Sequence, residues 1–310
     1  MTPALLKDSP WGPLEVADAH LHFFSHGFFT LLAKQAGLES AQAACARAGV
    51  EAPPADPRGF AAQWAAELDR HQVARAVLLA SLPGDEPSVA QAVESHPQRF
   101  WGWFFVNPLM PDAAARAEEW LQRGLRGVCL LPAMHGYALE DARVEEILQV
   151  AERRNALVFV HCGVLSVGIR ARVGAPSPFD LRFSNPVDLH PVALRHPGLR
   201  FVVPHFGAGY FREALMTASL CPNVYLDTSS SNAWTKLLAP PPSLEQVFER
   251  ALEVAGARRL LFGTDSSFFP RGWVSSVYER QCEALRQIGV SGEDARAIFG
   301  GNLARLMQTP

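Results

Sequence analysis

Short apolar runs recur along the chain, and each is followed by a longer stretch with the spacing of an amphipathic helix. The run at 74–80, for example, is short, almost entirely apolar and not alternating, which is typical of a strand buried on both faces. Eight such runs predict strands at 16–23, 74–80, 101–106, 127–131, 156–161, 199–205, 223–227 and 259–265.

The stretches between these runs predict the helices of the chain. They lie at 28–48, 60–71, 88–95, 113–123, 141–155, 191–196, 210–220, 244–255, 276–287 and 294–307. Strict alternation of buried strands with helices predicts a parallel α/β sheet, and eight units predict closure into one (β/α)8 TIM-barrel domain over 1–310. An open doubly wound sheet is the rival, but no Gly-rich phosphate loop follows its first strand.

Three connections after predicted strands are longer than the others. About fifty residues separate His22 from the second strand, nearly forty separate His161 from the sixth, and about thirty separate Asp227 from the eighth. In a barrel, such connections leave from the C-terminal face, where active sites lie. We therefore expect insertions after strands 1, 5 and 7 to wall a substrate pocket.

Composition excludes several classes of protein. Hydrophobic residues make up 48% of the chain and the formal net charge is -3, which favours a folded domain and argues against nucleic acid or acidic membranes as partners. The five cysteines are scattered and match neither a disulfide framework nor a CxxC zinc site. No apolar signal core or membrane-length run is present. We expect a cytoplasmic protein that acts on a small molecule.

Four histidines and one aspartate stand where predicted strands end. His20 and His22 share one face of the first strand because side chains alternate with a period of two. The other three are His161 after the fifth strand, His205 after the sixth and Asp265 after the eighth. All five meet at one mouth of the predicted barrel. A lone strand-end histidine is usually structural, but this set predicts a site where a metal activates water.

Several motifs resemble the amidohydrolase superfamily, specifically its amidohydrolase-related (amidohydrolase 2) branch. They are ADAHLHF, FVHCG, VPHFGAG, YLDTSS, LFGTDSSFF and GGNLARLM, and the resemblance covers nearly the whole chain. That branch includes aminocarboxymuconate-semialdehyde decarboxylase, aromatic-acid decarboxylases and lactone hydrolases. The resemblance implies metal ligation by His20, His22, His161 and Asp265. It also implies that His205 orients or protonates the metal-bound water or the substrate. In catalysis we expect His205 or Asp265 to move the proton.

The fourth strand departs from the pattern of binuclear relatives, in which a carboxylated lysine bridges two metals. Here that strand reads GVCLLP, without a lysine. We therefore expect one divalent ion, Zn²⁺ first, with Mn²⁺, Fe²⁺ or Co²⁺ as alternatives. A thiolate bridge from Cys129 is an alternative that we disfavour, because a buried strand cysteine is more often a small hydrophobe. Asp227 is interpreted as a hydrogen-bonding support of the mouth.

Three hypotheses about function stay open. The first is a hydrolase that attacks a small acyl, lactone or amide substrate with metal-activated water. The second is a metal-dependent, non-oxidative decarboxylase of an aromatic or muconate-type acid, which would use the same residues. The third is a non-catalytic metal-binding barrel. We prefer the hydrolase.

Residues that follow the strands are candidates for substrate binding. The set is Phe24, Asn107, His135, Arg170, Arg182 and Trp234. The phenylalanine suits an apolar or ring-containing substrate, and arginines on the long loop after His161, including Arg172, suit a carboxylate. Relatives often form dimers, so a homodimer is also expected, although no residue locates its interface.

Overall fold

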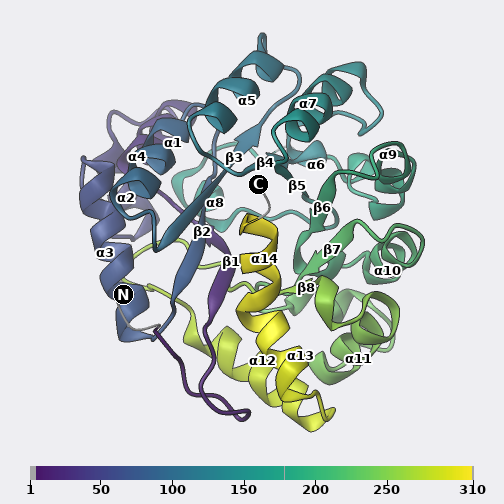
Figure 1. The fold of residues 1–310 in the computed structure, drawn as a ribbon. Coiled ribbons are helices and arrows are strands. Elements are labelled where there is room, and N and C mark those ends of the chain that lie inside the picture. Colours follow the sequence, from purple (N-terminus) through teal and green to yellow (C-terminus); the bar gives the residue numbers. More distant parts are fainter. Residues whose placement is uncertain (1–4, 178, 309–310) are drawn as a thin grey trace.

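Eight parallel strands form one sheet in the order β1 to β8, curled into a barrel (Figure 1). The computed structural model describes residues 5–177 and 179–308. The strands are β1 Ala17–His22, β2 Arg75–Ala80, β3 Phe100–Val106, β4 Gly127–Leu130, β5 Leu157–Val160, β6 Arg200–Val203, β7 Val224–Asp227 and β8 Leu260–Leu261. The predicted TIM-barrel fold and the position of each strand are confirmed.

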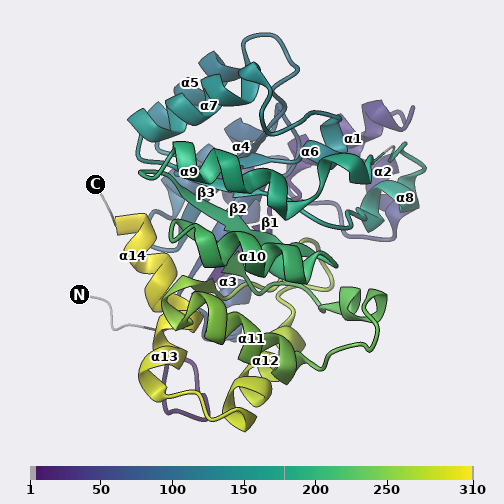
Figure 2. The ribbon, with the colours of Figure 1, turned by 90° about the vertical axis from the view of Figure 1, so that its right-hand side faces the viewer.

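Helices surround the barrel, and one closing helix, α14, lies across an end of it (Figures 1 and 2). The α-helices are α1 His26–Gln35, α2 Ala41–Ala48, α3 Pro57–Arg70, α4 Glu86–Ser95, α5 Ala113–Gln122, α6 Pro132–His135, α7 Ala142–Arg153, α8 Gly168–Val173, α9 Leu189–Arg195, α10 Phe211–Leu220, α11 Leu244–Ala255, α12 Ser275–Gln287, α13 Gly292–Arg296 and α14 Asn302–Gln308. Short 3-10 or π segments are η1 Leu181–Phe183, η2 Pro186–Asp188, η3 Pro204–Gly207, η4 Ala233–Leu237, η5 Ala257–Arg259 and η6 Ala297–Gly301.

Three predicted elements differ in the structure. The helix expected at 28–48 is split into α1 and α2, because Gly37 takes a left-handed conformation (φ 66°) that ends the first helix. The strand expected at 259–265 keeps its ladder only at Leu260–Leu261, and Asp265 also has a positive φ of 62°. The helix expected at 294–307 contains the π segment η6.

The barrel closes through a few backbone bonds between β1 and the segment after β8. The amide of Ala19 donates to the carbonyl of Phe262 (2.8 Å), and that of Asp265 donates to the carbonyl of His20 (2.9 Å). Leu21 and Ser266 form an isolated parallel bridge beside them. This seam between β1 and the β8 loop therefore joins the two segments that carry His20, His22 and Asp265.

A bulge in β1 sets the direction of its side chains. The pairing of β1 with β2 shifts register between Asp18 and Leu21. Ala17 precedes the shift and Ala19 lies within it, and both pack inside the barrel; after the shift, Leu21 joins the outer core under the helices. Because a bulge re-aims the side chains that follow it, His20 and His22 both point into the mouth.

The insertions after β1 and β5 pack against each other beside this mouth. Helices α1, α2 and α8 lie together at one side of the barrel (Figure 2). They share a separate apolar cluster that includes Phe28, Leu32, Cys45 and Val173. The expected pocket wall after strands 1 and 5 is thus a small packed unit.

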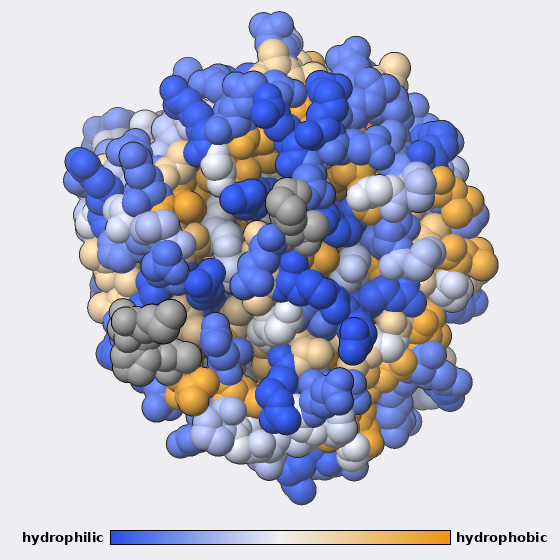
Figure 3. Space-filling view, viewed as in Figure 1, coloured by the Kyte–Doolittle hydropathy of each residue, from blue (hydrophilic) through white to orange (hydrophobic). Residues whose placement is uncertain are grey.

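The outer surface is largely hydrophilic on the face seen in Figure 3, with apolar patches near its right edge. On α9 and α10, the side chains of Leu194, Met216 and Leu220 are exposed. Among the described helices, none combines the length and apolar composition needed to cross a membrane.

Candidate metal centre and its cavity

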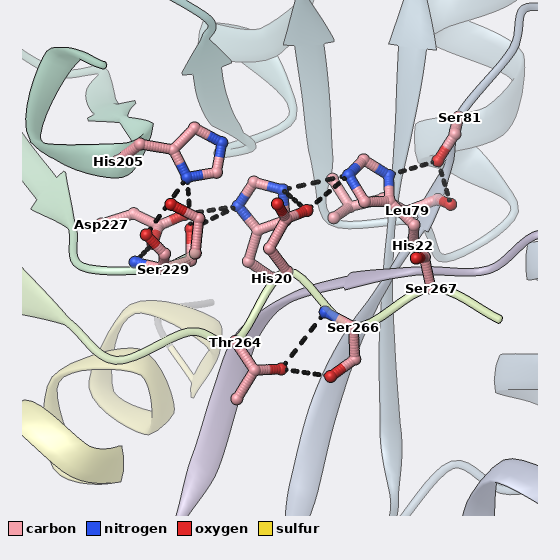
Figure 4. Close-up of polar contacts among 12 residues, drawn as sticks. His20, His22, Leu79, Ser81, His205, Asp227, Ser229, Thr264, Ser266 and Ser267 are labelled. Carbon is pink, nitrogen blue, oxygen red and sulfur yellow. Dashed lines mark hydrogen bonds and ion pairs between the residues drawn. The ribbon is translucent and has the colours of Figure 1, made fainter. Parts of the chain in front are cut away.

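Three atoms of the kind that ligate metals converge at the seam of the barrel, from His20, His22 and Asp265. Figure 4 shows the two histidines side by side. The Nε2 atoms of His20 and His22 lie 3.3 Å apart. Asp265 Oδ1 lies 3.1 Å from Nε2 of His22 and 3.8 Å from Nε2 of His20. All three atoms lie within 4.8 Å of one another, the spacing expected of ligands around one ion.

The other ring nitrogen of each histidine is held by an acceptor. Nδ1 of His20 lies 2.6 Å from Asp227 Oδ2, and a carboxylate can only accept, so this Nδ1 carries the proton. Nδ1 of His22 lies 2.6 Å from Oγ of Ser81, whose own hydrogen is directed at the Leu79 carbonyl (3.1 Å). Both rings therefore present an Nε2 lone pair toward the same point.

This arrangement fits a divalent cation. Two Nε2 lone pairs and one carboxylate oxygen are all acceptors, and their mutual repulsion at these distances is relieved by a positive ion between them. His161 adds a fourth group nearby: it lines the same cavity, and its buried Nδ1 has no hydrogen-bond partner. His161 lies outside the three-residue cluster formed by His20, His22 and Asp265.

His205 stands beside His20 at the end of β6. Its ring centroid is 4.9 Å from that of His20 and 5.5 Å from that of His161. His205 Nδ1 donates to the carbonyl of Ser229 (3.3 Å) and lies 2.9 Å from the Ser229 hydroxyl. Its Nε2 is therefore the nitrogen able to accept a proton. The left-handed backbone of His205 (φ 54°) turns the chain sharply at this point.

Burial and neighbouring charges set the protonation of the cluster. Burial favours a higher pKa for Asp265, but the neighbouring imidazoles, His22 first and then His20 and His205, outweigh it and hold the pKa below its usual range. Burial lowers the pKa of His22, His205 and His161. For His20, burial also acts downward, but Asp227 overcomes it and raises the pKa.

Asp18 fixes the two segments that carry the cluster. Its buried carboxylate accepts hydrogen bonds from the amides of His20 (2.9 Å) and Thr264 (3.1 Å) through Oδ1. Oδ2 accepts from the Thr264 hydroxyl (2.5 Å) and from the Trp273 indole (2.8 Å). One side chain thus connects the strand of His20 to the residue preceding Asp265.

The interpretation of Asp227 as a support is confirmed by its contact with His20. At the fourth strand, Cys129 is buried, and burial raises the pKa of its thiol well above the usual value. A protonated thiol is a poor metal ligand, so the disfavoured thiolate bridge gains no support.

A cavity of about 550 Å³ opens above the cluster. Of the predicted substrate residues, Phe24, Arg170 and Trp234 line it. Phe24 stacks on Phe28 with ring centroids 4.1 Å apart, which gives the cavity a flat aromatic wall. The loops after β1, β5 and β7 all contribute residues to the wall of the cavity, as expected from their lengths.

Asn107, His135 and Arg182 are absent from the described residues that line this cavity. Asn107 accepts a bond from the Leu109 amide in its own turn and lines a much smaller hollow. Arg182 is 83% exposed and paired with Asp180. His135 ends α6 as a half-buried ring, and burial lowers its pKa to about 4. A position after a strand does not determine where the loop then turns.

Sequence reasoning missed several residues of the site. Ser81 holds His22, and Lys236 and Arg271 line the cavity. Ser81 comes directly after the second predicted strand, and Arg271 follows Asp265 in the same loop. The position of each residue after a predicted strand was therefore the only sequence feature that indicated a place in the site. Serine and arginine are too common in loops for that position to single them out.

The fold and the site together define the class of metal-dependent TIM-barrel hydrolases and lyases, with ligand-type residues at the C-terminal ends of β1 and β8. Residues 17–307 match the family model described as "Amidohydrolase", so the chain belongs to the amidohydrolase family. The resemblance seen in the motifs is confirmed, and with it the expectation of an enzyme of this family.

The individual proteins that resemble this chain are more distantly related to it. Protein fluG of Emericella nidulans is 34% identical over 108 residues, which make up 34% of this chain and 12% of fluG, so the match spans a small part of that protein. A 5-carboxyvanillate decarboxylase from Novosphingobium aromaticivorans, with manganese and 4-hydroxy-3-methoxy-5-nitrobenzoic acid, has a TM-score of 0.66 at 14% identity and covers 100% of both chains.

A probable 2-pyrone-4,6-dicarboxylic acid hydrolase from Acinetobacter baumannii, with citric acid bound, has a TM-score of 0.61 at 18% identity. The alignment covers 96% of this chain and 100% of that one. At these identities the two structures show the shared barrel fold.

Proposed function

We propose that this protein is a metal-dependent hydrolase that directs an activated water at a small lactone, ester or amide. The observation that carries the proposal is the convergence of the His20 and His22 lone pairs with the Asp265 carboxylate. Hydrolysis is one of the reactions that a metal centre at a barrel mouth can perform.

The ligands in this proposal are His20, His22, Asp265 and the adjacent His161, for one divalent ion. Zn²⁺ is our first choice because the set is rich in imidazole nitrogen, and Mn²⁺ is the first alternative. A bound ion of this kind lowers the pKa of its water to roughly 7 and polarises a carbonyl. Asp227 and Ser81 keep the two imidazoles in the tautomer that binds.

His205 is the proposed proton carrier. Its Nδ1 hydrogen bond to Ser229 leaves Nε2 to take a proton from the nucleophile and to deliver it to the leaving group. Burial lowers the pKa of His205, so the ring is neutral and ready to act as a base at neutral pH. Asp265 is the alternative group for moving this proton.

The second candidate is a decarboxylase, and the cavity walls favour it. Phe24 and Phe28 form a flat aromatic surface, and Arg170 and Arg172 border the same space, as a ring-bearing acid would require. The manganese-containing barrel of similar fold is, by its description, a decarboxylase. The same histidines and aspartate would serve either reaction.

Parallel measurement of acid release and CO2 release separates the two. The zinc-loaded protein would be incubated with aromatic lactones and with hydroxybenzoic acids. We expect lactone hydrolysis that is lost on chelation, with turnover falling about 10²- to 10⁴-fold in His205→Asn while bound metal is retained. His190→Asn, on the outer helix α9, is the control and should keep its activity.

CO2 release without hydrolysis would contradict the hydrolase proposal and support the decarboxylase. A wild-type protein that takes up no metal would exclude both reactions and also the metal-binding role without catalysis.

A further inference from the structure

The cavity is unbalanced in charge. Among the described residues that line it, four side chains carry fixed positive charge, Arg170, Arg172, Lys236 and Arg271, and one carries a carboxylate, Asp265. That carboxylate is a proposed metal ligand, so it is occupied by the centre. A pocket walled by positive charge concentrates anions.

Arg271 is the cation attached most directly to the centre. One of its guanidinium nitrogens, Nη2, donates to the backbone carbonyl of Asp265 (2.9 Å) and to the hydroxyl of Ser267 (2.8 Å). Its guanidinium carbon lies 4.7 Å from the centroid of the Phe268 ring. These contacts fix the guanidinium of Arg271 beside the cluster of His20, His22 and Asp265.

A second guanidinium reaches the same ring from another loop. Arg172, on α8 after β5, has its guanidinium carbon 5.5 Å from the Phe268 centroid and donates to the Ala48 carbonyl. Within the described chain, no carboxylate forms an ion pair with Arg172 or Arg271. Two neighbouring cations without a protein anion are stabilised by an anionic ligand.

The loop that carries Arg271 is firmly anchored. The buried carboxylate of Glu67 on α3 accepts from the Trp273 amide (2.8 Å), and Ser266 Oγ accepts from the Val274 amide (3.0 Å). The Trp273 indole donates to Asp18 (2.8 Å). An arginine held on such a loop is preorganised to bind a carboxylate in a fixed orientation.

We infer that Arg271 binds a carboxylate of the substrate, assisted by Arg172 on the same Phe268 ring. This carboxylate is a separate group from the one that reacts at the metal centre. The inference rests on the proposed function and narrows it: the substrate is a planar, ring-containing acid, not a neutral lactone or amide. The aromatic wall of Phe24 and Phe28 receives the ring.

The test compares two probes of the same shape and different charge on the zinc-loaded protein. Isophthalate carries two carboxylates, and 3-carbamoylbenzoate replaces one of them by a neutral amide. Titration calorimetry would give both affinities for wild type, Arg271→Gln, Arg172→Gln and Arg182→Gln. Arg182 follows Arg172 in the same loop but lies outside the cavity and is paired with Asp180, so it is the matched control.

We expect wild type and Arg182→Gln to bind isophthalate with an affinity about tenfold or more higher than that for 3-carbamoylbenzoate. This ratio corresponds to one charge-assisted hydrogen bond. Arg271→Gln should lose most of this preference, and Arg172→Gln should reduce it without disturbing the bonds of Arg271. Equal binding of the two probes to wild type, failure of both to bind, or an unchanged preference in Arg271→Gln would overturn the inference. Binding needs no turnover, so an absence of hydrolysis would contradict the proposed function and leave this result standing.

Discussion

His20 and His22 have different partners but present the same free nitrogen. A carboxylate, Asp227, fixes one ring, and a hydroxyl that is itself committed to a carbonyl, Ser81, fixes the other. Such partners set the tautomer and orientation of a ligand and raise its basicity. The affinity of the centre therefore depends on residues that do not bind the ion.

Asp227→Asn tests this dependence. We expect the affinity for zinc to fall about 10- to 100-fold, because the amide cannot supply the negative charge that favours the Nδ1–H form of His20. Competition with a chromophoric chelator measures the change, and Asp8→Asn at the exposed N-terminal region is the control. An affinity equal to that of wild type would show that the 2.6 Å contact has no part in metal binding.

At this scale the sequence predicts the acceptor atoms and the supporting role of Asp227, but it misses Ser81. His20, His22 and Asp265 stand at strand ends, where position in the chain already determines position in the barrel. Ser81 acts through a contact with His22 that exists only once the ends of β1 and β2 meet, and Arg271 acts from a loop whose course the sequence does not determine. Arg182 and Asn107 failed as pocket residues for the same reason, since their loops turn away from the mouth.

Among the elements, the seam between β1 and the β8 loop carries the site. β8 has two ladder residues, so the loop that follows it is positioned by its backbone bonds to β1 together with side chains. Asp18 is central, because it binds the amides of His20 and Thr264 and also the Trp273 indole. We expect its loss to disturb both the fold and the metal site.

Asp18→Asn is expected to destabilise the protein by about 1–3 kcal/mol, because the new amide group meets donors at Thr264 and Trp273 and leaves them unsatisfied. Chemical unfolding should be measured at pH 8, above the pKa of about 6 to which burial raises Asp18. Metal titration on the same samples should show weaker binding. Thr264→Ser, which keeps the hydroxyl, is the conservative control. Wild-type values for both quantities in Asp18→Asn would refute this role.

A second buried carboxylate joins the loops after β1 and β2. Asp85, at the start of α4, accepts from the hydroxyls of Ser25 (2.7 Å) and Ser88 (2.6 Å), and Ser25 caps α1. Burial raises the pKa of Asp85 to about 7, with a smaller contribution from Glu86, which is itself paired with Arg116. The folded protein therefore keeps a proton on Asp85 at a pH where the unfolded chain has lost it.

The sign of the resulting pH dependence follows from this difference. Between the ordinary pKa of 3.8 and about 7, the folded state binds the extra proton, so this group's contribution to stability falls as pH rises. Asp85→Asn should remove a slope of up to about 1.4 kcal/mol per pH unit in that window. Unfolding free energies at pH 5, 6 and 7 measure it, with exposed Asp112→Asn as control. Parallel pH profiles for wild type and Asp85→Asn would contradict the assignment.

Periodicity predicts the barrel strands well because burial on both faces leaves a plain apolar signature. It fails where backbone conformation depends on single residues or on tertiary contacts. The helix at 28–48 breaks at Gly37, and the strand before Asp265 gives way to an irregular segment. The short helices α6 and α8 have too few residues to show a period.

For the whole molecule, the proposed ion lies across the place where the barrel closes. His20 and His22 belong to the first strand and Asp265 to the loop after the last, so one ion connects the two ends of the sheet. Fold closure and catalysis would then depend on the same contacts. The sequence predicts this barrel as a whole, but the cluster of α1, α2 and α8 beside its mouth follows from tertiary packing.

The central claim is that these residues hold one catalytic ion, and metal content tests it most directly. Wild type, Asp265→Ala and His190→Asn would be loaded with zinc, dialysed and assayed by elemental analysis. We predict close to one zinc per chain in wild type and His190→Asn, as for a mononuclear catalytic site, and loss of most of it in Asp265→Ala. Zinc absent from wild type, or retained equally in Asp265→Ala, would contradict the account.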